Sequence, residues 1–379
     1  MKIKQLFLMA AIGLMATASL TSCEDILGEW SKPAPATVTP AASVAVTSIT
    51  LSATEATINV GATETLAVTA VTPDNATDKT VTWSSSDKAI ATVADGVVTA
   101  VAAGTAIITA TANDGSGVTA TCSVTVLALF SVSADTKVIF SPGNLQYNSS
   151  EATYKWRFAE HQYDYVGAWN TSTWVDLFGW GAWTGDATNP INESTTAGDY
   201  SWADADFNQE SKLADESQRD YDWRTLTSAE WTYLFNTRTT ATTNMPTGTN
   251  SSEARYTKAT VAGVSGVILF PDDYAHPDGV TVTVSEAAYN TSNKAYNTFT
   301  VDATNWSTME TAGCVFLPAA GYRDGSAVDD AGTFGGYWSS SVNGANGAYG
   351  VGFGSGYLNP AAYSDRDVGV SVRLVRPAE

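Results

Sequence analysis

The sequence predicts a small all-β sandwich followed by an α+β domain, and three features of the chain predict this order. Short runs of β-branched residues, separated by turn residues, fill residues 46 to 126, which is typical of a β-sandwich. From about Phe130 onward, aromatic residues become dense and helix signals become few. Two short helices are nevertheless expected among many short strands in this second part, and that mixture is typical of an α+β domain.

The first predicted domain covers residues 45–127. Trp83 is expected to fill the core between its two sheets. Gly96 and Gly104 stand where turns need a positive φ, which glycine adopts without strain. The β-branched runs predict strands at 48–51, 65–68, 81–83, 97–101, 106–110 and 122–126.

Four segments of this domain form a recognisable pattern. They are VTWSSSD at 81–87, ATV at 91–93, GVVTA at 96–100 and GTA at 104–106. In this order they resemble the bacterial immunoglobulin-like group-2 domain. The resemblance implies a spacer or, less often, an adhesive surface. We expect a spacer, because neither aromatic residues nor charges concentrate on one face.

The second predicted domain covers residues 130–379. Its clearest helix begins at Thr227, where Thr227 and Glu230 form a capping box ahead of Trp231. A second short helix is predicted at 307–310. The expected strands are 138–147, which ends in a turn, its hairpin partner 153–159, and two later strands at 267–270 and 314–317.

Four motifs of the second domain also follow a recognisable order. They are DWRTLTSAEW at 222–231, FLPAAGYR at 316–323, GGYWSSS at 335–341 and VSVRLVRP at 370–377. Together they resemble the major paralogous domain family (FISUMP), which is related to the formylglycine-generating, sulfatase-modifying fold. The resemblance covers nearly all of 130–377. It implies a C-type-lectin-like fold for the α+β domain.

The beginning of the chain has the features of a secretion signal. Lys2 and Lys4 precede an apolar run at 6–14, which is too short to span a bilayer. The segment LTSC at 20–23 resembles the lipobox of bacterial lipoproteins. The resemblance implies that 1–22 is removed and that Cys23 receives a lipid, although an ordinary signal peptide with a chance cysteine is the alternative.

Residues 23–44 contain several prolines and no apolar periodicity, so they predict an extended tether. The acidic pair Glu24 and Asp25 resembles signals that send lipoproteins to the outer face of the outer membrane. We therefore expect a chain that is anchored by lipid in the outer membrane and exposed at the cell surface.

The charge balance excludes some partners. The chain has 19 Lys and Arg residues against 39 Asp and Glu residues, a net charge of −20. Such a charge repels nucleic acid and anionic lipid headgroups. The expected membrane contact is therefore the lipid anchor alone, and the expected partner is an extracellular protein or glycan. Cys122 and Cys314 lie in apolar surroundings in different predicted domains, so we expect two buried free thiols.

The sequence favours a protein without catalytic activity and without a cofactor. The formylglycine-generating enzymes of the related fold use a cysteine pair near their C-terminus, and this chain lacks that pair. Cys314 stands in an apolar strand, and His161 and His276 have no partner at hydrolase-like spacing. Fold alone does not assign chemistry.

Calcium-dependent sugar binding is a further alternative. The triplets that bind calcium and sugar in C-type lectins, EPN or QPD followed by WND, are absent. Asp272 and Asp273 could hold a structural calcium through oxygen ligands, but a solvated loop is the preferred interpretation. The tryptophan-rich segment 174–183 could stack against sugars, but we expect its rings in the core.

Near the C-terminus, Tyr349, Val351 and Phe353 alternate with glycines, so one face of a predicted strand is apolar and the other is bare. Alternate glycines either let another chain pack closely or mark positions where the side chain is free to vary. The segment resembles the variable region of proteins that retroelements diversify, whose mutated asparagine codons cannot yield Lys, Glu, Gln, Met or Trp. None of these five occurs in 343–368, although ordinary exposed turns have a similar composition.

This segment is the predicted recognition surface, because tyrosine rings and short polar side chains suit adaptable binding. Trp338, Val372 and Leu374 are assigned to the core beneath it, and Arg373 and Arg376 to fixed pairing. The alternative is a structural surface protein without a specific ligand. The predicted ligand-binding residues are Asn343, Asn346, Gly350, Gly352, Gly354, Tyr357, Asn359, Ala361, Tyr363, Ser364, Asp365 and Asp367.

Overall fold

The structure is a computed structural model of the chain, and it describes most of the sequence after residue 41. The predicted signal peptide, Cys23 and nearly all of the predicted tether lie outside the described residues. Within the described ranges, no helix is both long and apolar enough to cross a membrane. These ranges are 42–148, 150–167, 173–180, 213–215, 218, 221–246, 251–284 and 289–378.

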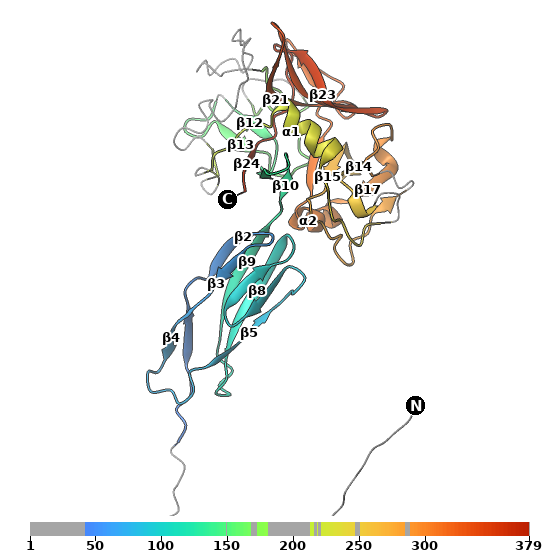
Figure 1. The fold of residues 1–379 in the computed structure, drawn as a ribbon. Helices are drawn as coiled ribbons and strands as arrows, with labels where there is room; N and C mark the ends of the chain where they lie inside the picture. The colour runs from blue at the N-terminus through green and yellow to red at the C-terminus, as the bar shows by residue number, and fades with distance from the viewer. Residues whose placement is uncertain are drawn as a thin grey trace, which may run out of the picture. The chain divides into compact units, whose positions relative to one another are not determined.

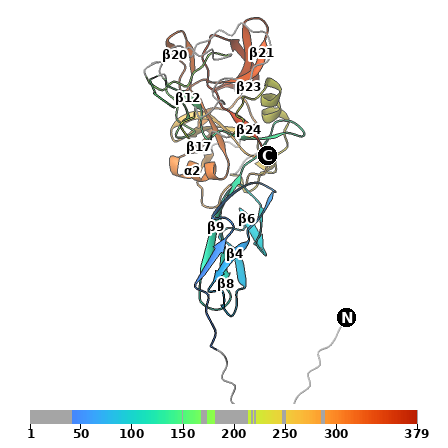
Figure 2. The same cartoon turned by 90° about the vertical axis from the view of Figure 1, so that its left-hand side faces the viewer.

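Residues 48–127 form a β-sandwich (Figures 1 and 2). One sheet has the order β2-β9-β8-β5, a second has the order β3-β7-β6, and β1 pairs with β4. Residues from both larger sheets, such as Val98, Ile108 and Val124, are fully buried in one core. The strands are β1 (Ser48–Leu51), β2 (Glu55–Asn59), β3 (Thr63–Thr65), β4 (Val68–Thr72), β5 (Val81–Ser85), β6 (Ala91–Ala94), β7 (Val97–Ala100), β8 (Gly104–Ala112) and β9 (Thr119–Leu127).

Several predicted details of the sandwich are confirmed and two are corrected. Gly96 and Gly104 have φ values of 83° and 146°, as expected. The predicted strand 65–68 is wrong, because β3 ends at Thr65 and β4 begins at Val68, with the buried Leu66 between them. Trp83 is only half-buried, because β5 is an edge strand and its side chains pack against the margin of the core.

The remaining described residues contain five further sheets. Their strand orders are β10-β11-β24, β12-β13, β16-β17-β14-β15-β18, β19-β20 and β21-β22-β23. The strands are β10 (Phe130–Ser131), β11 (Lys137–Phe140), β12 (Leu145–Tyr147), β13 (Trp156–Phe158), β14 (Tyr256–Val261), β15 (Val264–Leu269), β16 (Thr283–Val284), β17 (Phe299–Val301), β18 (Val315–Pro318), β19 (Tyr322–Asp324), β20 (Ala327–Asp329), β21 (Gly335–Asn343), β22 (Gly347–Gly354), β23 (Tyr357–Asp365) and β24 (Val375–Pro377).

The first hairpin of this region differs from its prediction. The segment 138–147 is two strands, because Pro142 and Gly143 interrupt it, and an added Cβ at Gly143 would lie 2.4 Å from the carbonyl oxygen of Ala159. The first strand, β11, pairs with β10 and with the C-terminal strand β24, and only β12 pairs with β13. The sequence did not indicate this pairing of distant segments.

The predicted helix at Thr227 is confirmed, together with its capping box. The Thr227 hydroxyl accepts a hydrogen bond from the Glu230 amide at 3.2 Å, and Glu230 Oε2 accepts one from the Thr227 amide at 2.7 Å. The helix buries Trp231 and continues into a wider turn that buries Leu234 and Phe235. These elements are α1 (Ser228–Thr232) and η2 (Tyr233–Thr237), followed by the single turns η3 (Ser251–Glu253) and η4 (Tyr296–Thr298).

The second helix, α2 (Ala303–Thr311), begins four residues before the predicted range of 307–310. Asp302 caps it, because its carboxylate accepts a hydrogen bond from the Asn305 amide at 2.8 Å. A single Asp-Ala-Thr-Asn run is a weaker helix signal than a capping box, so the start was missed.

The aromatic residues are mostly in the core, as expected. Trp338, Val372 and Leu374 are buried, and so is Trp180, whose indole N–H donates to the Ser339 carbonyl at 2.7 Å. Trp174 is half-buried, with Arg157 stacked 4.0 Å from its ring centre. The last residues of the tryptophan-rich segment, 181–183, lie outside the described residues.

Arg373 and Arg376, which were assigned to fixed pairing, both make contacts within this core. The Arg373 guanidinium donates to side-chain oxygens of Asn144 and Gln162, and Arg376 stacks 3.8 Å from the ring centre of Tyr221. These contacts fit the expected fixed roles, and the side-chain partners of Arg373 are neutral amides. Cys122 and Cys314 are buried free thiols, as predicted.

Asp272 is the clearest correction among the polar residues, because it is buried rather than part of a solvated loop. Its carboxylate pairs with Arg238 at 3.1 Å and with Lys137 at 3.2 Å, and it accepts hydrogen bonds from the Ser131 amide and hydroxyl. Asp273, by contrast, is exposed. Asp272 therefore stabilises the fold through an ion pair.

Candidate ligand pocket

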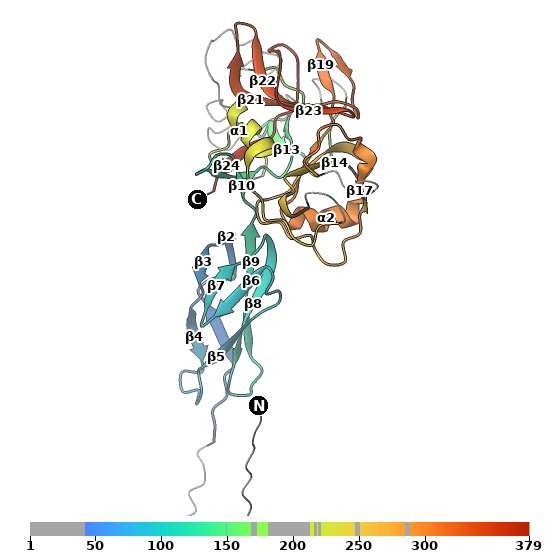
Figure 3. The ribbon, with the colours of Figure 1, turned by 45° about the vertical axis from the view of Figure 1, so that its right-hand side comes forward.

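The β21-β22-β23 sheet has one face in the core. Phe353 lies opposite Leu358 across the β22–β23 pair, and the ring of Tyr337 stacks on Phe353 with 6.1 Å between ring centres. Val351, two residues from Phe353, joins the same buried cluster. The helix α1 contributes Trp231 to this cluster, and Figures 1 and 3 show α1 beside β21.

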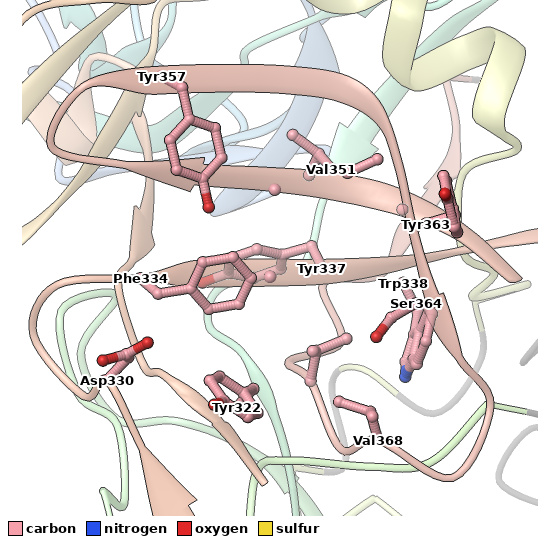
Figure 4. Close-up of a pocket in the computed structure, with 15 residues that line it drawn as sticks. Tyr322, Asp330, Phe334, Tyr337, Trp338, Val351, Tyr357, Tyr363, Ser364 and Val368 are labelled. Carbon is pink, nitrogen blue, oxygen red and sulfur yellow. The ribbon is translucent and has the colours of Figure 1, made fainter. Parts of the chain in front are cut away.

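The opposite face of the sheet is built largely of glycine and is hollow. Gly336 lies opposite Gly352, and Gly350 lies opposite Ala362, so their missing or short side chains share one face. A pocket of about 430 Å³ lies over them (Figure 4). A volume of this size lies within the range of small-molecule sites.

Aromatic rings from neighbouring segments form the walls of this pocket. Tyr322 of β19 and Phe334 meet edge to face, with 5.9 Å between ring centres and 86° between planes. Phe334 lies over the glycines, because a Cβ added at Gly336 would be 3.0 Å from its ring. In Figure 4, Tyr357 points its hydroxyl toward Phe334 from the other side of the pocket.

Two features fix the position of Tyr357. Its ring crosses Gly354, where an added Cβ would lie 2.7 Å from the Tyr357 ring. The carbonyl of Gly354 accepts a hydrogen bond from the ammonium of Lys258 at 2.5 Å, and Lys258 is buried.

Burial lowers the pKa of Lys258 to about 8. Partial burial, and then the nearby Asp330 carboxylate, raises the pKa of Tyr357.

The structure brings some of the predicted binding residues together and separates others. Gly350, Gly352, Tyr357, Tyr363 and Ser364 line the pocket. The remaining predicted residues are outside its described lining, and their role in binding stays a prediction. They are Asn343, Asn346, Gly354, Asn359, Ala361, Asp365 and Asp367.

The expectation of an exposed glycine face is wrong. Gly350, Gly352 and Gly354 are all buried. A Cβ at Gly350 would lie 2.4 Å from the carbonyl oxygen of Tyr337, and one at Gly352 would lie 3.1 Å from the Cβ of Ala362. Close packing therefore explains the glycine at position 350, and the glycine face is the floor of a pocket.

Tyr363 is exposed, as predicted, but its ring lies on the other face of the sheet from the glycines. It pairs with Tyr349, whereas the next residue back, Ala362, pairs with Gly350. Because successive side chains alternate between faces, the Tyr363 ring is turned away from Phe334, as Figure 4 shows. Tyr363 is 72% exposed and Tyr357 is 48% exposed.

The prediction missed the walls contributed by residues 322–334. Tyr322, Asp330 and Phe334 precede the predicted surface in the chain, and nothing in their spacing links them to Gly350 or Tyr357. Tyr322 belongs to the FLPAAGYR motif, which was the available signal. Val368 and Val370, from the segment after β23, complete the apolar lining.

The described lining of the pocket has one carboxylate, that of Asp330, and no histidine or cysteine. In the described part of the chain, no group of three or more His, Cys, Asp or Glu side chains is placed to hold a metal ion. Cys314 belongs to a different core cluster, where burial raises the pKa of its thiol. His276 contacts the Tyr274 hydroxyl at 3.0 Å and is also away from the pocket lining.

The glycine floor leads to a stability prediction. We expect Gly350→Ala to lower the free energy of unfolding by about 1 to 3 kcal/mol, because the new methyl group must displace the backbone of β21. Gly356→Ala, in the β22–β23 turn, has no atom within 4 Å of the added Cβ and should change it by less than about 0.5 kcal/mol. Urea unfolding followed by tryptophan fluorescence measures both, and equal effects would contradict the close packing.

Comparison with known proteins identifies the class of the first domain. Residues 45–124 match the bacterial Ig-like domain (group 2). This match covers the β-sandwich, and it agrees with the resemblance found in the sequence.

Curated relatives are similar to parts of the chain. The chain is 46% identical over 123 residues to an Ig-like virion protein of Serratia phage KSP90, covering 32% of this chain and 45% of that protein. It is 47% identical over 87 residues to an uncharacterized protein of Clostridium acetobutylicum, covering 23% and 9%. It is 63% identical over 57 residues to an alpha-L-arabinofuranosidase of Bifidobacterium longum subsp. longum, covering 15% and 5%. The chain spans less than half the length of each of these relatives.

Proposed function

We propose that this chain is a non-catalytic surface lipoprotein whose C-terminal head binds an extracellular protein or glycan in the pocket on the glycine face. Lipid on Cys23 attaches the chain to the outer membrane. Residues 23–44 are the tether, the Ig-like domain is the stalk, and 130–379 form the head.

The pocket is the observation that carries the proposal. A hollow of about 430 Å³ has a floor of backbone and walls of aromatic rings. Aromatic and apolar walls with a few polar groups are typical of ligand sites. The partly exposed Tyr357 has the amphipathic ring that recognition surfaces favour.

A C-type-lectin-like fold for the head is supported by the way its motifs meet. The indole N–H of Trp231, in the first motif, donates to the carbonyl of Trp338, in the third motif, at 3.3 Å. The amide of Arg224 donates to the carbonyl of Val375, in the fourth motif, at 2.8 Å. Motifs that lie far apart in the sequence thus contact one another, as the resemblance to a single-domain family requires.

Diversification by a retroelement stays part of the proposal in a narrower form. Within 343–368, close packing leaves little freedom at buried Gly350. Free variation is compatible with the exposed positions of the predicted surface, where a new side chain meets solvent. These are Asn346, Tyr357, Asn359, Ala361, Tyr363, Asp365 and Asp367.

A binding screen tests the proposed function. The labelled full chain is applied to a glycan array and to extracellular proteins, and we expect saturable binding that Tyr357→Ala weakens at least about tenfold, the effect of losing a central aromatic contact. Tyr154→Ala is the matched control, because Tyr154 is also exposed and lies outside the pocket lining. It should leave the affinity within about twofold.

The second candidate is a structural surface protein without a specific ligand. The match of residues 45–124 to the bacterial Ig-like domain fits this candidate, because such a domain can serve as a spacer without a ligand of its own. Absence of saturable binding in the whole screen would support this candidate and contradict a recognition role for the head.

A further inference from the structure

We propose that the occupant of the pocket is a lysine side chain of a basic partner protein. This inference rests on the proposed binding function and names the chemistry of the ligand. Its observation is a pocket lined by three aromatic rings with one carboxylate at its edge, in the segment 319–378, whose exposed charged side chains are all acidic.

The rings and the carboxylate face one space. Tyr322, Phe334 and Tyr357 surround the pocket, and the Asp330 carboxylate lies at its edge in Figure 4. The faces of aromatic rings attract cations, and cages of such rings hold alkylammonium groups. Asp330 is the only charged side chain in the described lining. A lysine would place its apolar stem against the rings and its ammonium near Asp330.

The charges around the pocket point to a cation as well. In residues 319–378, which supply the described lining, every basic side chain is buried and every acidic one is exposed. The basic residues are Arg323, Arg366, Arg373 and Arg376, and the acidic ones are Asp324, Asp329, Asp330, Asp365 and Asp367.

The arginines of this segment are too buried to contact a ligand at this surface. Arg323 donates to the Gly325 carbonyl at 2.6 Å, and Arg366 donates to the Gly347 carbonyl at 3.1 Å. Their exposed fractions are 0% and 3%. A ligand at this surface therefore meets carboxylates and rings, and positive charge on the ligand gives the complementary potential.

The distribution of the carboxylates favours a protein over a small amine. One ammonium in the pocket would contact Asp330, but the other exposed aspartates are outside the described lining. A basic protein surface can place further positive charges opposite them, and it gains association rate from the net charge of −20. Asp365 and Asp367, predicted as binding residues, then contribute long-range attraction.

A fluorescence-anisotropy titration tests this inference on the full chain. The probes are a labelled lysine-rich peptide, the same peptide with glutamate at each lysine, and a neutral oligosaccharide mixture. We expect the lysine peptide to bind and the glutamate peptide not to bind. We expect the affinity to fall as salt is raised from low to physiological ionic strength, because part of the attraction is screened.

Four variants separate the contributions. Tyr357→Ala should weaken binding of the lysine peptide about tenfold, whereas Tyr357→Phe, which keeps the ring, should stay within about twofold. Asp330→Asn should weaken it about fivefold. Asp278→Asn is the control, because Asp278 is exposed and lies outside the pocket lining.

The outcomes distinguish this inference from the proposed function. If the oligosaccharides bind in a Tyr357-dependent manner and the lysine peptide does not, the head is a binding module and the lysine assignment is overturned. Lysine-peptide binding that is unchanged in Tyr357→Ala and equal in Asp330→Asn and Asp278→Asn would also overturn it, since the attraction would then be non-specific. If no probe binds, the lysine assignment is likewise overturned, and the binding screen described above decides on the proposed function.

Discussion

Replacing Asp272 by alanine should lower the free energy of unfolding of this chain by about 3 to 5 kcal/mol, because it leaves a buried guanidinium without its counter-charge. Arg238 is fully buried and donates to Asp272 at 3.1 Å. Its other hydrogen bonds go to the backbone carbonyls of Leu234, Arg255 and Phe270. Burial lowers the pKa of Arg238 to about 10, and Asp272 opposes that shift. In Asp272→Ala, the dipoles of these carbonyls alone would have to stabilise the charge of Arg238.

The neighbouring residue supplies the control for this prediction. Asp273 is exposed, so Asp273→Ala should change the free energy of unfolding by less than about 0.5 kcal/mol. Urea denaturation of both variants and the wild type measures the difference. Equal midpoints and slopes for Asp272→Ala and Asp273→Ala would show that the ion pair does not stabilise the fold.

The same ion pair should make the free energy of unfolding depend on pH. Burial acts to raise the pKa of Asp272, but the Ser131 hydrogen bond and the Arg238 charge outweigh it, and the net shift is downward. The unfolded chain therefore binds a proton at Asp272 at a higher pH than the folded chain does. The stability from Asp272 is present above about pH 4, the pKa of an unfolded aspartate, and is lost as the pH falls toward the folded value.

Gly352→Leu should abolish binding of the ligand without unfolding the head, and this is the largest effect we expect on function. Gly352 forms part of the pocket floor, and an added Cβ would lie 3.1 Å from the Cβ of Ala362 and 3.8 Å from the ring of Phe334. A shift of a few tenths of an ångström accommodates the Cβ, and the rest of the leucine occupies the space that a ligand needs. We expect the affinity to fall at least about a hundredfold, which corresponds to about 2.8 kcal/mol.

Ala327→Leu is the matched variant for this test. Ala327 of β20 is exposed, lies outside the pocket lining and is not one of the predicted binding residues, so the leucine adds similar bulk to the surface without entering the pocket. We expect it to keep the wild-type affinity within about threefold. If Gly352→Leu binds as well as the wild type, and its circular dichroism is unchanged, the pocket is not the recognition site.

Much of the local structure followed from residue patterns. Thr227 and Glu230 predicted the start of α1, because a capping box satisfies the free amides of a helix end by itself. Gly96 and Gly104 predicted turns, because positive φ is a local property. Pairing between distant segments was not predictable, and β11 with β24 is the example. Nothing within either strand specifies its partner.

The candidate site was predictable only in part for the same reason. Alternating glycines after Tyr349 correctly indicated a sheet face without side chains, since the alternation of a strand fixes which residues share a face. Burial of that face depends on Phe334 and Tyr322, which come from earlier segments. The pairing that turns Tyr363 to the other face depends on an irregularity in register between Gly350 and Gly352. A strict alternation read from the sequence cannot contain such a bulge.

A structure of the chain bound to the first ligand from the binding screen tests the central claim most directly. We predict that the ligand lies on the floor formed by Gly350 and Gly352, with contacts to the rings of Tyr322, Phe334 and Tyr357. A ligand seated elsewhere on the head, or on the Ig-like domain, with these rings in contact only with one another and with solvent, would contradict the claim.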